Sequence, residues 1–118
     1  MALYYNLAKV YALSEVDSEM VNKTINQFVD GIFFDLDEIK KGIDEGNYEL
    51  TYRFANKIKP TVDLFGMKVV FDEIIEIEEW SKSHGKKKEV KETYKSIHKH
   101  IEKAVKEIKK DFKLKIAE

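Results

Sequence analysis

The stretch that decides the fold is RFANKIKPTVDLFG, residues 53–66. A helix turns 100° per residue, so one through this stretch gathers five side chains within about 40° of one line: Leu50, Phe54, Ile58, Thr61 and Phe65. We expect that line to face the core. On the opposite side, within about 60° of one another, lie Tyr52, Asn56, Lys59 and Asp63. The stretch therefore predicts an amphipathic helix over residues 48–65, with Asn56 facing solvent at its middle.

Apolar stripes predict a long helix on each side of this one. The stripe before it has residues three or four apart: Val21, Ile25, Phe28, Ile32, Leu36, Ile39 and Ile43. We expect Ser14 or Asp17 to be its N-cap, a kink or break near Gly31, and a C-cap at Gly46. The stripe after it comprises Val69, Val70, Phe71, Ile74, Ile75 and Ile77, and ends at Trp80. Gly66 is expected to end the central helix.

The remaining elements complete the predicted fold. The last helix should follow a turn at residues 83–85 and bury Val90, Tyr94, Ile97, Ile101, Ala104, Val105, Ile108 and Phe112. A short helix over residues 3–12 should pack Leu7, Val10 and Tyr11. Four long amphipathic helices with short links predict an all-α fold. We expect one domain, residues 1–118, built as an antiparallel four-helix bundle with a short N-terminal accessory helix.

The segment from Ala55 to Gly66 resembles the active helix of histidine-containing phosphotransfer (HPt) domains of two-component phosphorelays. That helix reads roughly Ala-His-x-Leu/Ile-Lys-Gly-Ser/Ala, with a glycine ten residues after the histidine. The chain matches it at Ala55, Ile58, Lys59, Thr61 and Gly66. Asn56 stands at the phosphorylated position, and Pro60 replaces the usual glycine. The likeness extends over about residues 14–112 and implies the HPt four-helix core.

The resemblance also implies a function. An HPt histidine takes a phosphoryl group from a receiver domain through its neutral imidazole and passes it on, while a nearby lysine neutralises charge. Lys59 fits that lysine by position. Asn56 cannot attack phosphorus because its amide nitrogen is conjugated to a carbonyl. The resemblance thus implies a pseudo-HPt module that docks a response-regulator receiver domain or a hybrid histidine kinase without relaying phosphate. Its partner surface should comprise Asn56, Lys59, Tyr52, Asp63, Pro60, Thr61 and Gly66.

Pro60 predicts a local distortion. Proline has no N–H for the carbonyl four residues back, and that carbonyl belongs to Asn56. We expect the helix to bend there. The bend is either a tolerated kink with water on the free carbonyl, or a kink that displays Asn56 and Lys59 outward for docking.

Composition excludes several classes of protein. The chain has no cysteine, so it has no disulfide, thiolate metal site or cysteine nucleophile. Neither a signal peptide nor an apolar run near the ~18 residues of a membrane span is recognisable. We therefore expect a cytoplasmic protein without a membrane, metal or cofactor, and a monomer, as HPt modules commonly are. A hydrophobic content of 43% suffices for one modest core.

Charge is divided unevenly along the chain. Residues 81–118 hold 13 lysines and 6 acidic residues (net +7), while residues 1–80 hold 8 Lys/Arg and 16 acidic residues (net −8). The lysines follow a periodic helix, which favours a solvated helix face over an anion-binding surface. We expect no nucleic-acid partner for a phosphorelay module of this kind.

Other candidate residues carry weaker signals. His84 falls in a turn, and His98 and His100 are about 200° apart on a helix, so they cannot share a metal ion. The acidic run at residues 72–79 is expected to be a solvated helix face, and six phenylalanines have core spacing: Phe28, Phe33, Phe34, Phe54, Phe65 and Phe71.

Three functional hypotheses remain. The leading one is a receiver-docking module without enzymatic activity of its own. The second is an active HPt carrier whose histidine has been changed to Asn56 in this chain. The third, from another class, is a helical anion or nucleic-acid binder that uses the lysines of residues 82–115; DNA retention that depends on salt would favour it.

Overall fold

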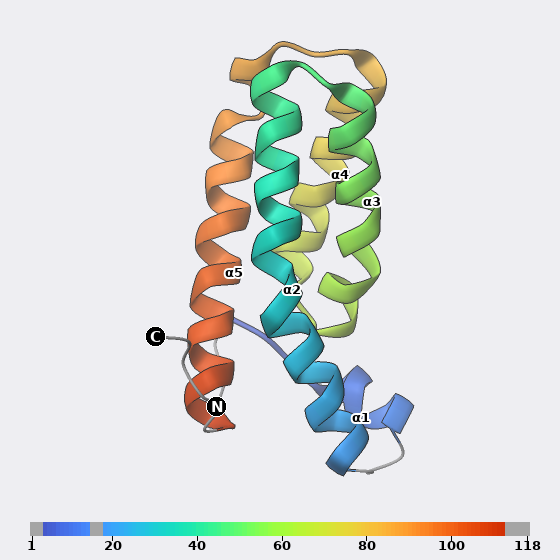
Figure 1. The fold of residues 1–118 in the computed structure, drawn as a ribbon, viewed down its shortest axis with the longest axis vertical. Helices are drawn as coiled ribbons and strands as arrows, with labels where there is room; N and C mark the ends of the chain where they lie inside the picture. Colours follow the sequence, from blue (N-terminus) through green and yellow to red (C-terminus); the bar gives the residue numbers. More distant parts are fainter. Residues whose placement is uncertain (1–3, 15–17, 113–118) are drawn as a thin grey trace.

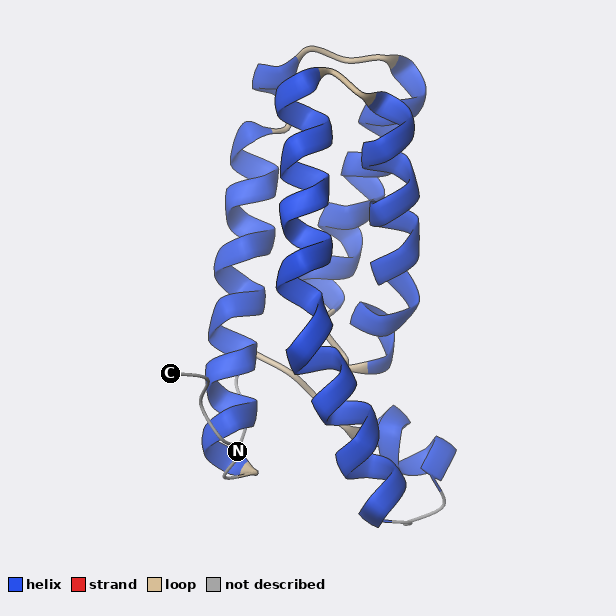
Figure 2. Cartoon of the chain, in the orientation of Figure 1, coloured by secondary structure: helices blue, strands red, loops and turns tan. Residues whose placement is uncertain are grey.

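The computed structural model describes residues 4–14 and 18–112 of the chain. Within these residues the chain is all-helical and contains no strand (Figure 2). Its helices are α1 (Ala8–Ser14), α2 (Ser18–Glu45), α3 (Tyr48–Leu64), α4 (Lys68–Ser83) and α5 (Lys91–Asp111), with a single 3₁₀ turn, η1 (Lys87–Glu89), before α5. The four long helices lie side by side (Figure 1). The short helix α1 lies beside the first turns of α2 and does not run alongside the other three. The predicted helical class is confirmed.

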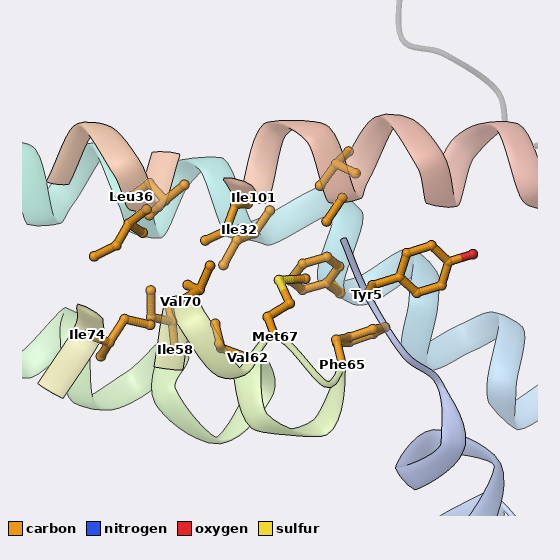
Figure 3. Close-up of a cluster of buried hydrophobic side chains, with 14 of the residues drawn as sticks. Tyr5, Ile32, Leu36, Ile58, Val62, Phe65, Met67, Val70, Ile74 and Ile101 are labelled. Carbon is orange, nitrogen blue, oxygen red and sulfur yellow. The ribbon is translucent and has the colours of Figure 1, made fainter. Parts of the chain in front are cut away.

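The apolar stripes of α2 and α5 form about half of the core. All seven predicted stripe residues of α2 are buried, and so are those of α5 apart from Phe112, which is partly buried. Together with α3 and α4 they form one cluster, in which Ile32, Leu36 and Ile101 face Ile58, Val62 and Ile74 (Figure 3). Burying such a side chain stabilises the fold by about 1.5–3 kcal/mol.

Three helices end with the same hydrogen-bond pattern. Gly46 and Gly66 follow α2 and α3 with φ of 67° and 68°, and each turn closes with one bond across three residues and one across five. This is the Schellman motif, which favours glycine because φ is positive. Both predicted glycine positions are therefore confirmed. His84 takes the same left-handed conformation after α4, with φ of 54°.

Hydrogen bonds hold the N-terminal segment, residues 4–7, against the ends of α3 and α5. The Asn6 N–H donates to the Phe65 carbonyl at 2.8 Å, and the Tyr5 hydroxyl donates to Asp111 at 2.6 Å. A Cβ on Gly66 would lie 2.6 Å from the Asn6 Cβ. Gly66 thus serves the turn and the packing of this segment, which runs past Phe65 and Met67 in Figure 3.

The predicted core face of α3 needs correction. Its fully buried residues are Thr51, Ala55, Ile58, Val62 and Phe65, whereas Leu50, Phe54 and Thr61 are only half-buried. The helix packs against both α2 and α4, so its buried arc is centred between them and includes small residues. The Asn47 side chain caps this helix by accepting from the Leu50 N–H at 3.0 Å, and the helix continues unbroken through Pro60.

Other boundary predictions were also wrong. The prediction near Gly31, a kink or a break, is wrong only for the break: α2 is continuous there, and its ribbon bends partway along (Figure 1). Tyr11, Val69 and Ile75 are exposed instead of buried. Ser14 is the last residue of α1 and not the cap of α2, and the other proposed cap, Asp17, lies outside the described residues. No helix in the described ranges is long and apolar enough to span a bilayer.

Candidate functional site

Asn56 lies at the middle of α3 with its side chain exposed, as predicted. Its amide nitrogen donates a hydrogen bond to Glu78 Oε2 of α4 at 3.1 Å. The Asn56 side chain is therefore not free in solvent, because it is oriented by a carboxylate from the neighbouring helix.

Lys59 binds the other oxygen of the same carboxylate. Its Nζ lies 2.9 Å from Glu78 Oε1, and the Lys59 side chain is 29% exposed while that of Glu78 is 6% exposed. The hydrogen bond to Glu78 raises the pKa of Lys59 above its ordinary value, and partial burial opposes that shift. We call Asn56, Lys59 and Glu78 the Asn56 cluster. Both oxygens of the Glu78 carboxylate are bonded within this cluster, and the cluster carries no net charge.

Glu78 is the residue that the sequence analysis missed. It was assigned with the other acids of residues 72–79 to a solvated face, yet it is buried. One signal could have identified it, since Val70, Ile74 and Glu78 follow one another at four-residue intervals on the buried side of α4. Burial of a carboxylate requires partners, and Lys59 and Asn56 supply them.

The other predicted site residues are dispersed. Tyr52 is half-buried, and its ring lies 5.6 Å from the Lys82 Nζ. Asp63 is exposed and bonds to Lys9 of α1 at 2.8 Å, away from the cluster. Pro60 is exposed beside Lys59. Thr61 is half-buried and faces α2, and Gly66 packs against Asn6 at the helix end. The structure therefore brings only Asn56 and Lys59 together around Glu78.

A partly exposed aromatic pair lies between α2 and α3. Phe34 was expected in the core but is 61% exposed, and its ring lies 6.3 Å from that of Phe54. Arg53 and Lys57 approach the Phe54 ring at 5.6 and 5.4 Å. We call Phe34 and Phe54 the aromatic patch. Phe34 and Val69 are the most exposed large apolar side chains of the described residues. Because the Phe34 ring lies next to a second aromatic ring, we treat the patch as a candidate contact surface.

A hollow of about 260 Å³ lies between α2 and α3. Gly31, Asp35, Ile58 and Thr61 are among its lining residues. Asp35 accepts from Lys57 at 2.8 Å, so its charge is paired at the rim. A Cβ on Gly31 would meet nothing within 4 Å, which leaves the hollow open at this point.

Each of the three histidines contacts an aromatic ring or a backbone carbonyl. His84 stacks on Tyr48 with ring centroids 4.4 Å apart, and His98 lies 5.8 Å from the Phe33 ring. His100 Nδ1 is 2.8 Å from the Ser96 carbonyl and 3.9 Å from Glu73, one of whose buried oxygens has no hydrogen-bond partner. Glu73 is half-buried and therefore also departs from the predicted solvated face. No group of three metal-ligating side chains occurs among the described residues.

No protein-family model, no curated protein and no solved structure matches this chain.

Proposed function

We propose that this protein is an HPt-like docking module that binds a receiver domain and does not accept its phosphoryl group. The observation that carries the proposal is the position of Asn56, exposed at mid-helix within the segment Ala55–Gly66 and one turn before Lys59. In this proposal the four long helices form the antiparallel bundle of that family, and α1 is the accessory helix.

The chemistry of the Asn56 cluster supports a binding role. The Asn56 amide nitrogen has no free lone pair for attack on phosphorus. Lys59 is already paired, and a phosphoryl group at position 56 would meet the Glu78 carboxylate at hydrogen-bond distance. Like charges this close repel, and burial of Glu78 reduces screening by water. The cluster therefore favours a docked partner over a bound phosphate.

The aromatic patch and the hollow supply a contact surface between α2 and α3, on the other side of α3 from Asn56. Aromatic side chains dominate binding energy at protein interfaces when they enter a pocket on the partner. Phe34 can do so because it projects from α2, while the hollow can receive a side chain from the partner. The proposed surface thus runs from Asn56 across the outer face of α3 to Phe34.

Binding to receiver domains tests this proposal. Each receiver domain encoded in the same genome would be titrated by calorimetry against the full chain. We expect at least one to bind, and Phe34→Ala to weaken that binding about tenfold. Val69→Ala is the matched control, because Val69 is also 61% exposed but lies on α4; it should change affinity less than about twofold.

Two outcomes would contradict the proposal. One is that no receiver domain binds. The other is that the receiver binds with equal affinity to the parent chain and to Phe34→Ala, which would place the interface elsewhere. Because Phe34 is exposed, its truncation should not unfold the protein, and circular dichroism would verify this.

A further inference from the structure

A second hollow lies between α2 and α5, near the end of α2. Its volume is about 380 Å³, and four lysines line it: Lys40, Lys87, Lys91 and Lys95. Ile43 and Tyr94 also line it, and both are buried, so the base is apolar. The Tyr94 hydroxyl donates to the Leu36 carbonyl of α2 at 3.0 Å, which ties the two helices together beneath the hollow. We call this feature the lysine groove.

The lysine groove has an excess of positive charge. Asp44 is its single acidic lining residue, and it accepts from Lys40 at 2.7 Å. Lys95 has only a loose approach to Glu92 at 3.7 Å, and no ion pair within the described chain involves Lys87 or Lys91. Four lysines against one aspartate leave a net charge of +3 around an apolar base. Lysine stems add apolar wall while their ammonium groups reach the rim.

A neighbouring hollow of about 310 Å³ extends the groove along α5. It shares Lys40, Tyr94 and Lys95 with the first hollow. It adds Lys99, and also Asp37, His98 and Glu102. Lys91, Lys95 and Lys99 are four residues apart, so they lie on one helix face at steps of about 6 Å. An extended or helical segment could therefore pair with several of these ammonium groups in succession.

The lysine groove is remote from the Asn56 cluster. α3 packs against α2 and α4, and α5 packs against α4 and α2. The edge between α2 and α5 is therefore opposite the edge between α3 and α4, as Figure 1 shows. A ligand in the groove would not compete with a partner on the Asn56 side.

We infer that the lysine groove binds an acidic peptide segment of a partner protein, with an apolar side chain on Ile43 and Tyr94 and carboxylates on the surrounding lysines. Charge complementarity supplies the attraction, and the apolar base supplies an anchor that a uniformly charged ligand cannot use. This inference does not depend on the proposed function at Asn56.

A peptide fits the groove better than a nucleic acid. Single-stranded nucleic acid is held largely by stacking on exposed aromatic rings. The Tyr94 ring is 8% exposed and its hydroxyl is already bonded, so it offers little stacking surface.

Fluorescence anisotropy with the full chain tests the inference. The probe is a labelled peptide of about 12 residues with glutamates around a central leucine. As a helix it is long enough to span Lys91, Lys95 and Lys99. The variant is Lys91→Gln with Lys95→Gln. The control is Lys106→Gln with Lys110→Gln, which removes the same charge from exposed positions of the same helix, also four residues apart.

We expect the groove variant to weaken binding about tenfold at physiological ionic strength, and the control less than about twofold. A peptide with glutamine in place of glutamate should bind far more weakly than the probe. Equal weakening by both variants, or equal binding of both peptides, would overturn the inference. Tighter binding of a DNA duplex through the same lysines would also overturn it, in favour of a nucleic-acid site.

Discussion

Two edges of this protein differ in whether their lysines are paired with carboxylates. At the edge between α3 and α4, Lys59 and Asn56 each bond to one oxygen of the buried Glu78 carboxylate, and the group is neutral. At the edge between α2 and α5, neither Lys87 nor Lys91 forms an ion pair within the described residues. The lysine groove at this edge therefore has a net positive charge. The first arrangement stabilises the fold and presents a fixed neutral surface. The second leaves charge available to a ligand.

Charge reversal should separate the two edges most strongly. Lys59→Glu places a second carboxylate beside the buried Glu78, so we expect the free energy of unfolding to fall by about 2–3 kcal/mol. Lys91→Glu makes the same charge change at an exposed site and should alter stability by less than about 0.5 kcal/mol. Urea denaturation of both variants at neutral pH measures the difference. Equal effects would mean that the Asn56 cluster contributes no more to stability than a surface pair.

Tyr94 links the lysine groove to stability at high pH. Burial, with the negative charges of Asp37 and Asp44, raises the pKa of Tyr94 from 10.0 to about 12. Between these values the unfolded chain has lost the tyrosine proton and the folded chain retains it. The free energy of unfolding should therefore fall as pH rises from about 10 to 12, by up to about 2.7 kcal/mol from this residue.

The Tyr94→Phe variant should lack that part of the decline. It should also be about 1 kcal/mol less stable at pH 7, because the hydroxyl bond to Leu36 is lost. Burial and the hydrogen bond to Asp111 also raise the pKa of Tyr5, so Tyr5→Phe should remove a separate part of the decline. Urea denaturation over this pH range measures both. An unchanged slope in Tyr94→Phe would show that the folded protein ionises this residue as readily as the unfolded chain does.

The sequence predicted the helices better than it predicted their contacts. The stripes of α2 and α5 are long, regular and one-sided, so their periodicity alone identified the core residues. In α3 the large side chains Leu50 and Phe54 suggested a core face that the small residues Thr51 and Ala55 actually occupy. Hydropathy ranks residues by type, whereas burial here depends on the two neighbours between which α3 packs.

The candidate site was predicted only where it lies on one helix. Asn56 and Lys59 are one turn apart, and helical geometry sufficed to place them on a common face. Glu78 belongs to another helix and to an acidic run, so its pairing with Lys59 became visible only in three dimensions. Phe34 shows the reverse error, because its core-like spacing on α2 hid an exposed ring. Both errors concern contacts between helices. The spacing of apolar residues along one helix does not show which side chains a neighbouring helix covers.

The most direct test of the central claim is a phosphotransfer assay with Asn56→His. Because residue 56 is exposed, this change should cost less than about 0.5 kcal/mol of stability. The variant should take label from a phosphorylated receiver domain that binds the protein, and the parent chain should stay unlabelled. Adding Glu78→Gln should speed labelling, because it removes a negative charge at hydrogen-bond distance from residue 56. Labelling of the parent chain, or failure of both variants with a receiver that binds, would contradict the proposal that this protein is an HPt-like module in which Asn56 replaces the nucleophile.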